Sequence, residues 1–470
     1  MRHGHTSIVN FVSRLIRSAA GFLATIVLTR TLGQERYGTY VLVLSVVAWV
    51  TIVADPGLTK AVQKRVSETS PGNYVAAGAL SLFGLLVAVS VALWLGEPFL
   101  TGYLGMEATI ILVVVLGSNL IGTFVRTVLI GQHRVHVASL TEPLEWGIRS
   151  GVQVALVLTG FGLAGAFAGY FIGSVVAAAI GLYFVNIDLA RPTREEFQNL
   201  RSFAQFSWLD SIRGQAFLSM DTVILGYFVA NSVIAVYAVS WNLATLFATF
   251  GASIAVTLFP EMSKISSEGE VEEVGNLLEV SLAYAGLFTI PGLLGGAIIG
   301  DRVLAIYGSG FSTGYAILLV LTFARLLYGY QSQFVNTLNA IDRPDLTFRL
   351  NSVFITTNLV LNLALTPIYG WYGAAVATTI STTIGLVLGF RYASSVVDLS
   401  LPILEVAKQV VAAGVMAGVV GVGRLLFGES IPLIVALVAV GGFVYFAVFT
   451  AISQQFRTTV RDNLPEKIPF

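Results

Sequence analysis

The sequence predicts an all-α integral membrane protein with about fourteen transmembrane helices, and three observations lead to this prediction. Hydrophobic residues make up 56% of the 470 residues, charged residues make up only 11%, and the mean hydropathy is +0.82. A soluble globular domain carries about 25% charged residues, so this chain has too few charges to cover a surface exposed to water. Apolar runs of about 20 residues, long enough to cross a bilayer, fill nearly the whole chain.

Each predicted helix is an apolar run that is bounded by short polar or glycine-containing turns. The first six are predicted at 8–29, 38–58, 75–95, 108–130, 139–159 and 162–186. The next six are predicted at 204–229, 233–258, 278–300, 312–338, 347–366 and 371–392. The last two are predicted at 403–426 and 431–452. No connecting loop is long enough to fold as a separate domain, so nearly all of the protein is expected within the membrane.

The distribution of basic residues between alternate loops predicts the orientation of the helices. With the N-terminus in the cytoplasm, the cytoplasmic loops and termini contain 16 Lys and Arg residues and the outer loops contain four. Cytoplasmic loops of membrane proteins are enriched in Lys and Arg, so this excess predicts an even number of helices with both termini inside. A missed pair of adjacent helices would leave the pattern unchanged, so twelve helices remain an alternative.

Two similar segments indicate an internal repeat. LTRTLGQERYGTY (28–40) follows the first predicted helix, and LGYFVANSVIAVY (225–237) follows the seventh. Each is a short outer turn that leads to a tyrosine just inside the next helix. Two parallel six-helix halves would produce this pattern. We therefore expect an N-terminal lobe at 1–190, a C-terminal lobe at 195–395, and two appended helices within 400–455.

Composition also excludes several kinds of function. The chain has no cysteine, which excludes disulfides, thiolate catalysis and cysteine metal sites. Its net charge of zero argues against a nucleic-acid partner. We expect no metal and no cofactor, because the two neighbouring histidines His133 and His136 have no nearby carboxylate. Lysine is rare, with five residues against 21 arginines, which is compatible with GC-rich coding as in haloarchaea.

One long stretch resembles a known transporter family. The segment LNAIDRPDLTFRLNSVFITTNLVLNLALTPIYGWYGAAVATTIS (338–381) is similar to the lipid-linked oligosaccharide flippases of the multidrug/oligosaccharidyl-lipid/polysaccharide (MOP) exporter superfamily. The family pattern stands here as Asn362, Pro367, Gly370, Gly373, Ala374 and Ala375. The segments 30–38, 219–229 and 290–311 also resemble that family, and the resemblance covers about residues 1–395.

The resemblance implies a fold and a function. It implies two six-helix lobes around a central cavity, lined mainly by helices 1, 2, 7 and 8, that opens alternately to the two sides of the membrane. The implied activity is to move a polyprenyl- or dolichyl-phosphate-linked glycan from the cytoplasmic to the outer leaflet of the plasma membrane. Such a protein is a transporter, not an enzyme, and we expect it to act as a monomer.

The charged residues within the predicted helices are the candidate site. Insertion of an arginine at the centre of a membrane helix costs about 2.5–3.5 kcal/mol of free energy, so we expect each such arginine to have a structural or functional role. Arg14 and Arg17 share a helix face, and their long side chains either reach the cytoplasmic headgroups or face the cavity and bind phosphate. Arg213 and Arg325 are further candidates for phosphate binding, Arg325 in the middle of its helix.

Three aspartates are candidates for a cation site or for charge pairs. They are Asp55, Asp210 and Asp221, and each is costly to bury unless it pairs with an arginine or binds Na⁺ or H⁺. Asp210 and Arg213 are spaced to neutralise one another. Glu145 and Arg149 have i, i+4 spacing, which predicts a structural ion pair.

Glycines at helical spacing predict close helix packing in two places. They are Gly165, Gly169 and Gly173 in one helix, and Gly414 and Gly418 in another.

Two other functions are alternatives to the flippase. A cation-coupled multidrug exporter of similar fold usually has twelve helices and buried acidic residues as its working groups. A membrane-embedded glycosyltransferase would need carboxylates or a metal on a sizeable loop, which this sequence does not offer. Fourteen helices and paired arginines favour the flippase.

Overall fold

The computed structural model describes residues 2–68, 73–186, 191–428 and 430–463, and all regular secondary structure in these ranges is helical. The chain divides into two compact units of nearly equal size. Unit 1 comprises Met1–Ala235 and unit 2 comprises Val236–Phe470. The predicted lobe boundaries, at 190 and 195, differ from this division and remain a prediction.

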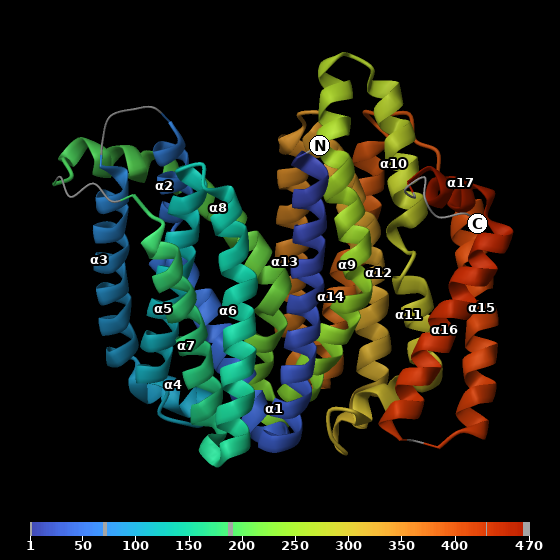
Figure 1. Ribbon diagram of the computed structural model, residues 1–470, viewed down its shortest axis with the longest axis horizontal. Helices are drawn as coiled ribbons and strands as arrows, with labels where there is room; N and C mark the ends of the chain where they lie inside the picture. The colour runs from blue at the N-terminus through green and yellow to red at the C-terminus, as the bar shows by residue number, and fades with distance from the viewer. Residues whose placement is uncertain (1, 69–72, 187–190, 429, 464–470) are drawn as a thin grey trace. The chain divides into compact units, whose positions relative to one another are not determined.

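Unit 1 is a bundle of long helices that short helices connect at its two ends (Figure 1). Its first five helices are α1 (Arg2–Ala54), α2 (Leu58–Ser67), α3 (Tyr74–Leu95), α4 (Glu97–Leu104) and α5 (Thr109–Gly131). α1 covers the first two predicted helices, and they meet at Gly33, where φ is 74°. This left-handed conformation suits glycine, and it breaks the helix in the polar turn that the sequence predicts.

The rest of unit 1 continues the bundle. It comprises α6 (Val135–Leu156), a π-helical turn (Val157–Phe161), α7 (Gly162–Tyr183), α8 (Arg194–Phe228) and the first residues of α9 (Asn231–Ser267). α6 and α7 are joined by a tight turn in which Gly160 and Gly162 both have positive φ. The two helices can therefore fold back on one another without a loop.

The predicted glycine stripe on α7 is confirmed as a packing surface. A Cβ atom added to Gly169 would lie 2.6 Å from the backbone nitrogen of Gln153, and one added to Gly173 would lie 2.8 Å from the Cα of Arg149. Real side chains do not approach backbone atoms so closely, so only glycine permits this contact between α7 and α6. Close approach of this kind is how helices associate within membranes, where no hydrophobic effect drives them together.

Unit 2 contains the remaining helices. They are the rest of α9, α10 (Val271–Ala285), α11 (Thr289–Ala305), a 3₁₀ turn (Phe311–Gly314), α12 (Tyr315–Ala340), α13 (Pro344–Tyr369), α14 (Trp371–Ala393), α15 (Ile403–Leu426), α16 (Ile431–Ile452) and α17 (Gln454–Asn463). α12, α13 and α14 pack on one another, and α15 and α16 pack on one another and on α11.

A polar ladder joins α13 and α14 within this bundle. Asn358 donates to the hydroxyl of Thr378 at 3.1 Å, and Asn362 donates to the backbone oxygen of Asn358 at 3.0 Å. Asn362 belongs to the segment that carries the family resemblance, and it is completely buried.

The helix boundaries agree with the prediction to within a few residues for most segments. The predicted helix at 278–300 is instead two helices, α10 and α11, separated at Gly286–Phe288. Pro291 in the first turn of α11 has no N–H to continue a helix from α10, which accounts for the separation. In the described ranges, 11 segments are long and apolar enough to span a membrane. The total of fourteen therefore remains a prediction.

The prediction of close packing at Gly414 and Gly418 is wrong. Among the described residues, no atom of a neighbouring element lies within 4 Å of a Cβ built on either glycine, whereas one built on Gly423 would lie 2.4 Å from Leu437 of α16. α15 packs on α11 through Ala412, Met416 and Val420. Both terminal nitrogens of Arg424 also donate to Asp301 of α11, at 3.0 and 2.7 Å. Glycine spacing alone does not show which face of a helix has a neighbour.

Candidate functional site

Four of the seven predicted site residues have side chains outside the described part of the structure. They are Arg14, Arg17, Asp210 and Arg213. The backbone of the first two belongs to α1 and that of the other two to α8, which are the helices predicted for them. The roles of these four residues remain predictions.

Arg325 is buried within unit 2, where its side chain is 5% exposed. Its Nη2 donates to the hydroxyl of Thr245 at 2.6 Å, and its guanidinium carbon lies 4.0 Å from the centre of the Trp241 ring. Both partners are on α9, so this arginine connects the middle of α12 to α9. An arginine held over an aromatic face is stabilised by about 0.5–2 kcal/mol, which offsets part of the cost of placing it there.

Asp55 forms a helix cap in the structure. Its carboxylate accepts from the backbone N–H of Thr59 at 3.1 Å and from the hydroxyl of the same residue. These bonds satisfy donors in the first turn of α2, as a capping carboxylate does. Asp221 lies on α8 and is 8% exposed. A role for either aspartate in a cation site remains a prediction.

The predicted ion pair between Glu145 and Arg149 is wrong. The carboxylate of Glu145 instead accepts from Arg126 of α5 at 2.9 Å and from the hydroxyl of Ser174 of α7 at 2.7 Å. Both carboxylate oxygens are therefore used by neighbouring helices. The i, i+4 rule describes an isolated helix surface, and here two packed helices offer Glu145 other partners.

Arg149 is consequently surrounded by aromatic and neutral polar groups. Its Nη2 donates to the hydroxyl of Tyr40 at 3.1 Å, and its guanidinium carbon lies 3.8 Å from the ring centre of Tyr170 and 4.7 Å from that of Trp146. Gln153, one turn further along α6, donates to the same tyrosine hydroxyl at 2.7 Å. In the described part of the chain, no carboxylate lies within 4.0 Å of Arg149.

The described groups in direct contact with the Arg149 guanidinium are two aromatic rings and a hydroxyl. The two aromatic rings and the hydroxyl stabilise the guanidinium, but neither adds a negative charge. Glu145 is one turn away on α6, and its partner Arg126 also lies 3.9 Å from Glu142, so two carboxylates stand beside the two arginines of this region.

The sequence contains a signal for part of this cluster. Trp146, Arg149 and Gln153 are spaced i, i+3 and i+7, so they lie on one face of α6. Tyr40 is the tyrosine that follows the first repeated turn. The contact between Tyr40 and this face of α6 could not be predicted from the sequence, because it depends on how α1 and α7 pack against α6.

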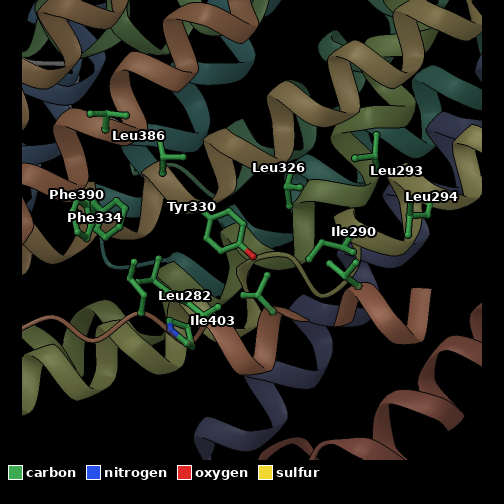
Figure 2. Close-up of a pocket in the computed structure, with 15 residues that line it drawn as sticks. Leu282, Ile290, Leu293, Leu294, Leu326, Tyr330, Phe334, Leu386, Phe390 and Ile403 are labelled. Carbon is green, nitrogen blue, oxygen red and sulfur yellow. The ribbon is translucent and has the colours of Figure 1, made fainter. Parts of the chain in front are cut away.

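Unit 2 contains an apolar cavity with a volume of about 580 Å³. Figure 2 shows Phe334 and Phe390 at one end of it and Leu293 and Leu294 at the other, with Tyr330 between them. α10, α11, α12, α14 and α15 contribute its walls. No charged residue lines this cavity, so it can accommodate hydrocarbon and offers no cationic group to a phosphate.

No metal centre is found among the residues that the structure describes. They contain no group of three or more His, Asp or Glu side chains placed to hold an ion.

Comparison with known proteins identifies relatives along the whole chain. Residues 4–266 match the family described as polysaccharide biosynthesis protein. The chain is 34% identical to the probable flippase AglR of Haloferax volcanii, with 98% of each chain covered. It is 26% identical to the probable low-salt glycan biosynthesis flippase Agl15 of the same organism, with 99% of each covered.

Solved structures show the same fold. The lipid II flippase MurJ in an inward closed conformation superposes with a TM-score of 0.80 at 16% identity, and 97% of this chain and 100% of that chain are covered. An inward-facing multidrug resistance MATE family transporter of the MOP superfamily gives a TM-score of 0.64 at 16% identity, with 82% and 97% covered. Identities this low establish a common fold and no common substrate.

Proposed function

Because the chain belongs to the polysaccharide biosynthesis protein family of the MOP exporter superfamily, we propose that it is a flippase that moves a lipid-linked glycan across the cell membrane. The observation that carries this proposal is the 34% identity to the probable flippase AglR over 98% of both chains. The relatives are named as flippases, which are transporters and not enzymes. The many apolar helices agree with a multi-pass membrane protein.

The proposed cargo is a glycan on a polyprenyl or dolichyl phosphate carrier, taken from the cytoplasmic leaflet and released to the outer leaflet. Arginine is suited to such a cargo because its planar fork donates two parallel hydrogen bonds to phosphate oxygens. Arg14, Arg17, Arg213 and Arg325 are the proposed phosphate contacts. Among these residues, Arg325 has a described setting: the Thr245 hydroxyl and the Trp241 ring hold its guanidinium.

The proposed mechanism is alternating access, in which the cavity between two lobes opens first to the cytoplasm and then to the outside. The membrane potential can supply the driving force, because a headgroup with two negative charges gains about 2 × 2.3 kcal/mol per 100 mV when it leaves an inside-negative cell. About 4.6 kcal/mol corresponds to a concentration bias of more than a thousandfold. In this scheme Asp55, Asp210 and Asp221 need not bind Na⁺ or H⁺.

A deletion strain tests the function directly. We expect cells without this protein to accumulate a lipid-linked glycan on the cytoplasmic side and to lose the corresponding surface glycan. Wild-type protein supplied from a plasmid should restore the surface glycan. Unchanged glycans together with new sensitivity to organic cations would contradict the proposal and favour a cation-coupled multidrug exporter.

A further inference from the structure

We infer that the two repeated turns form an outer latch, a set of contacts that holds the outer end of the transport pathway closed and releases when cargo leaves. The latch consists of residues 33–42 of α1, residues 223–232 at the junction of α8 and α9, and Tyr103 of α4. The predicted topology puts both turns on the outer side. The latch is a part of the proposed alternating-access mechanism, so its assignment rests on that function.

The first feature of the latch is a helix cap that another helix supplies. The carboxylate of Glu35 on α1 accepts from the backbone N–H of Ser232 in the first turn of α9, at 3.2 Å. The first N–H groups of a helix have no partner within it, and a negative charge beside them is favourable. Ala230, directly before α9, has no side-chain acceptor of its own. The carboxylate cap is therefore present only while the two turns are in contact.

The second feature is close packing between the two turns. A Cβ atom added to Gly38 would overlap the backbone carbonyl of Asn231, so only glycine permits this approach. The side-chain amide of Asn231 donates to the hydroxyl of Thr39 at 2.9 Å. Thr39 is 8% exposed, although it lies in a polar turn between two membrane segments. The second turn therefore covers the first one and excludes water from it.

The outer end of α8 is held in the same way by α4 and α1. The hydroxyl of Tyr103 on α4 donates to the backbone carbonyl of Val223 at 2.5 Å. A Cβ atom added to Gly226 would lie 2.6 Å from the same hydroxyl oxygen and 2.5 Å from Cδ1 of Leu42 on α1. The last turn of α8 thus lies in a socket that α1 and α4 form together.

The third feature is the unit to which the second turn belongs. The internal repeat places the start of the C-terminal lobe at residue 195, so α8 and the start of α9 are predicted in that lobe. In the structure α8 packs on α1, α2, α3 and α4, and unit 1 accordingly extends to Ala235. The outer ends of the two predicted lobes are thus joined within one compact unit. A cargo that leaves between these lobes requires this segment to separate from α1 and α4.

Paired cysteines can test the latch in the full-length protein, because the chain has no cysteine of its own. In Thr39→Cys/Asn231→Cys, copper phenanthroline or a short bis-methanethiosulfonate should join the two turns. We expect flipping of a fluorescent lipid-linked sugar in proteoliposomes to be lost after cross-linking and to return on reduction. Gln132→Cys/Asn186→Cys is the matched control, since Gln132 donates to the backbone oxygen of Asn186 at 2.6 Å and both belong to the predicted N-terminal lobe. Its cross-link should leave flipping unchanged.

A second measurement follows opening of the latch directly and needs no cargo. Leu42→Cys places a thiol at a fully buried position, so a membrane-impermeant maleimide should label it slowly in intact cells. In this background Gly38→Ala should raise the labelling rate by about tenfold or more, because the added methyl group forces the turns apart. Glu35→Ala removes only the cap and should raise it by about tenfold or less. Gly102→Ala in α4 is the control, because no described atom outside its own helix lies within 4 Å of a Cβ there.

Three results would overturn the latch. The first is that neither reagent cross-links Thr39→Cys/Asn231→Cys, and the second is that the cross-linked protein flips at its reduced rate. The third is equal labelling in Gly38→Ala and Gly102→Ala or, if Gly38→Ala does not fold, in Glu35→Ala and Gly102→Ala. Normal flipping by the cross-linked protein removes only the latch. No flipping by the wild type removes the proposed function, and the labelling rates then decide on the latch alone.

Discussion

The contact between Gly173 of α7 and Arg149 of α6 gives the most quantitative prediction. In Gly173→Ala the new methyl carbon would lie 2.6 Å from the Cβ of Arg149 and 2.8 Å from its Cα and backbone nitrogen. Ordinary van der Waals contact begins at 3.4 Å, so the two helices must separate locally by 0.6–0.8 Å. Two of the three atoms belong to the backbone, so no side-chain rotation can relieve the overlap.

The expected cost follows from this overlap. Overpacking of a well-packed interior typically costs about 1–3 kcal/mol. Gly151→Ala in α6 is the matched control, because no atom of the described residues outside its own helix lies within 4 Å of a Cβ at Gly151. There the substitution should stabilise the helix by about 0.5–1 kcal/mol. We therefore expect the two variants to differ in unfolding free energy by about 1.5–4 kcal/mol, with Gly173→Ala the less stable.

Unfolding of the two purified variants in the same nanodiscs, followed by tryptophan fluorescence, measures this difference. Displacement of α6 should also stretch the 2.7 Å bond from Gln153 to Tyr40. Equal stability of the two alanine variants would refute the reasoning, since it would mean that α6 and α7 are not in backbone contact.

Three further predictions concern topology, the cavity and the attachment of α15. Reporter fusions at Asn231 and at the C-terminus should report opposite sides of the membrane, and the same side for both would refute the two-lobe topology. Arg17→Ala should abolish complementation of glycan export at an unchanged protein level; normal export would mean that this arginine only reaches the headgroups. Arg424→Ala should lower unfolding stability by about 1 kcal/mol or less, because its bidentate pair with Asp301 is about one third exposed; a loss of several kcal/mol would show that this pair holds α15 in place.

A test of the driving force completes the predictions. Flipping of a fluorescent lipid-linked sugar in proteoliposomes should follow the sign of a potassium diffusion potential, without any sodium or pH gradient. If the flipping rate does not depend on the potential but requires Na⁺ or H⁺, transport is coupled to that cation. Its binding would then be assigned to Asp55, Asp210 and Asp221.

The sequence by itself determined the class of protein and most of its helices. Apolar runs of about 20 residues can be satisfied in a bilayer only as helices, because each backbone N–H must find a partner within its own segment. The runs at 403–426 and 431–452 therefore match α15 and α16 residue for residue. The break at Gly33 was also predictable, because a polar turn separates two apolar runs there.

The tertiary structure decided which partner each polar side chain meets. Glu145 and Arg149 have the spacing of an ion pair, yet α5 and α7 supply Arg126 and Ser174 to the carboxylate and leave the arginine to aromatic rings. Gly173 and Gly414 look alike in sequence, yet only the first has a helix against it. Periodicity fixes which residues share a face of one helix, but the neighbour of that face depends on packing between segments far apart in the chain, which no local pattern encodes.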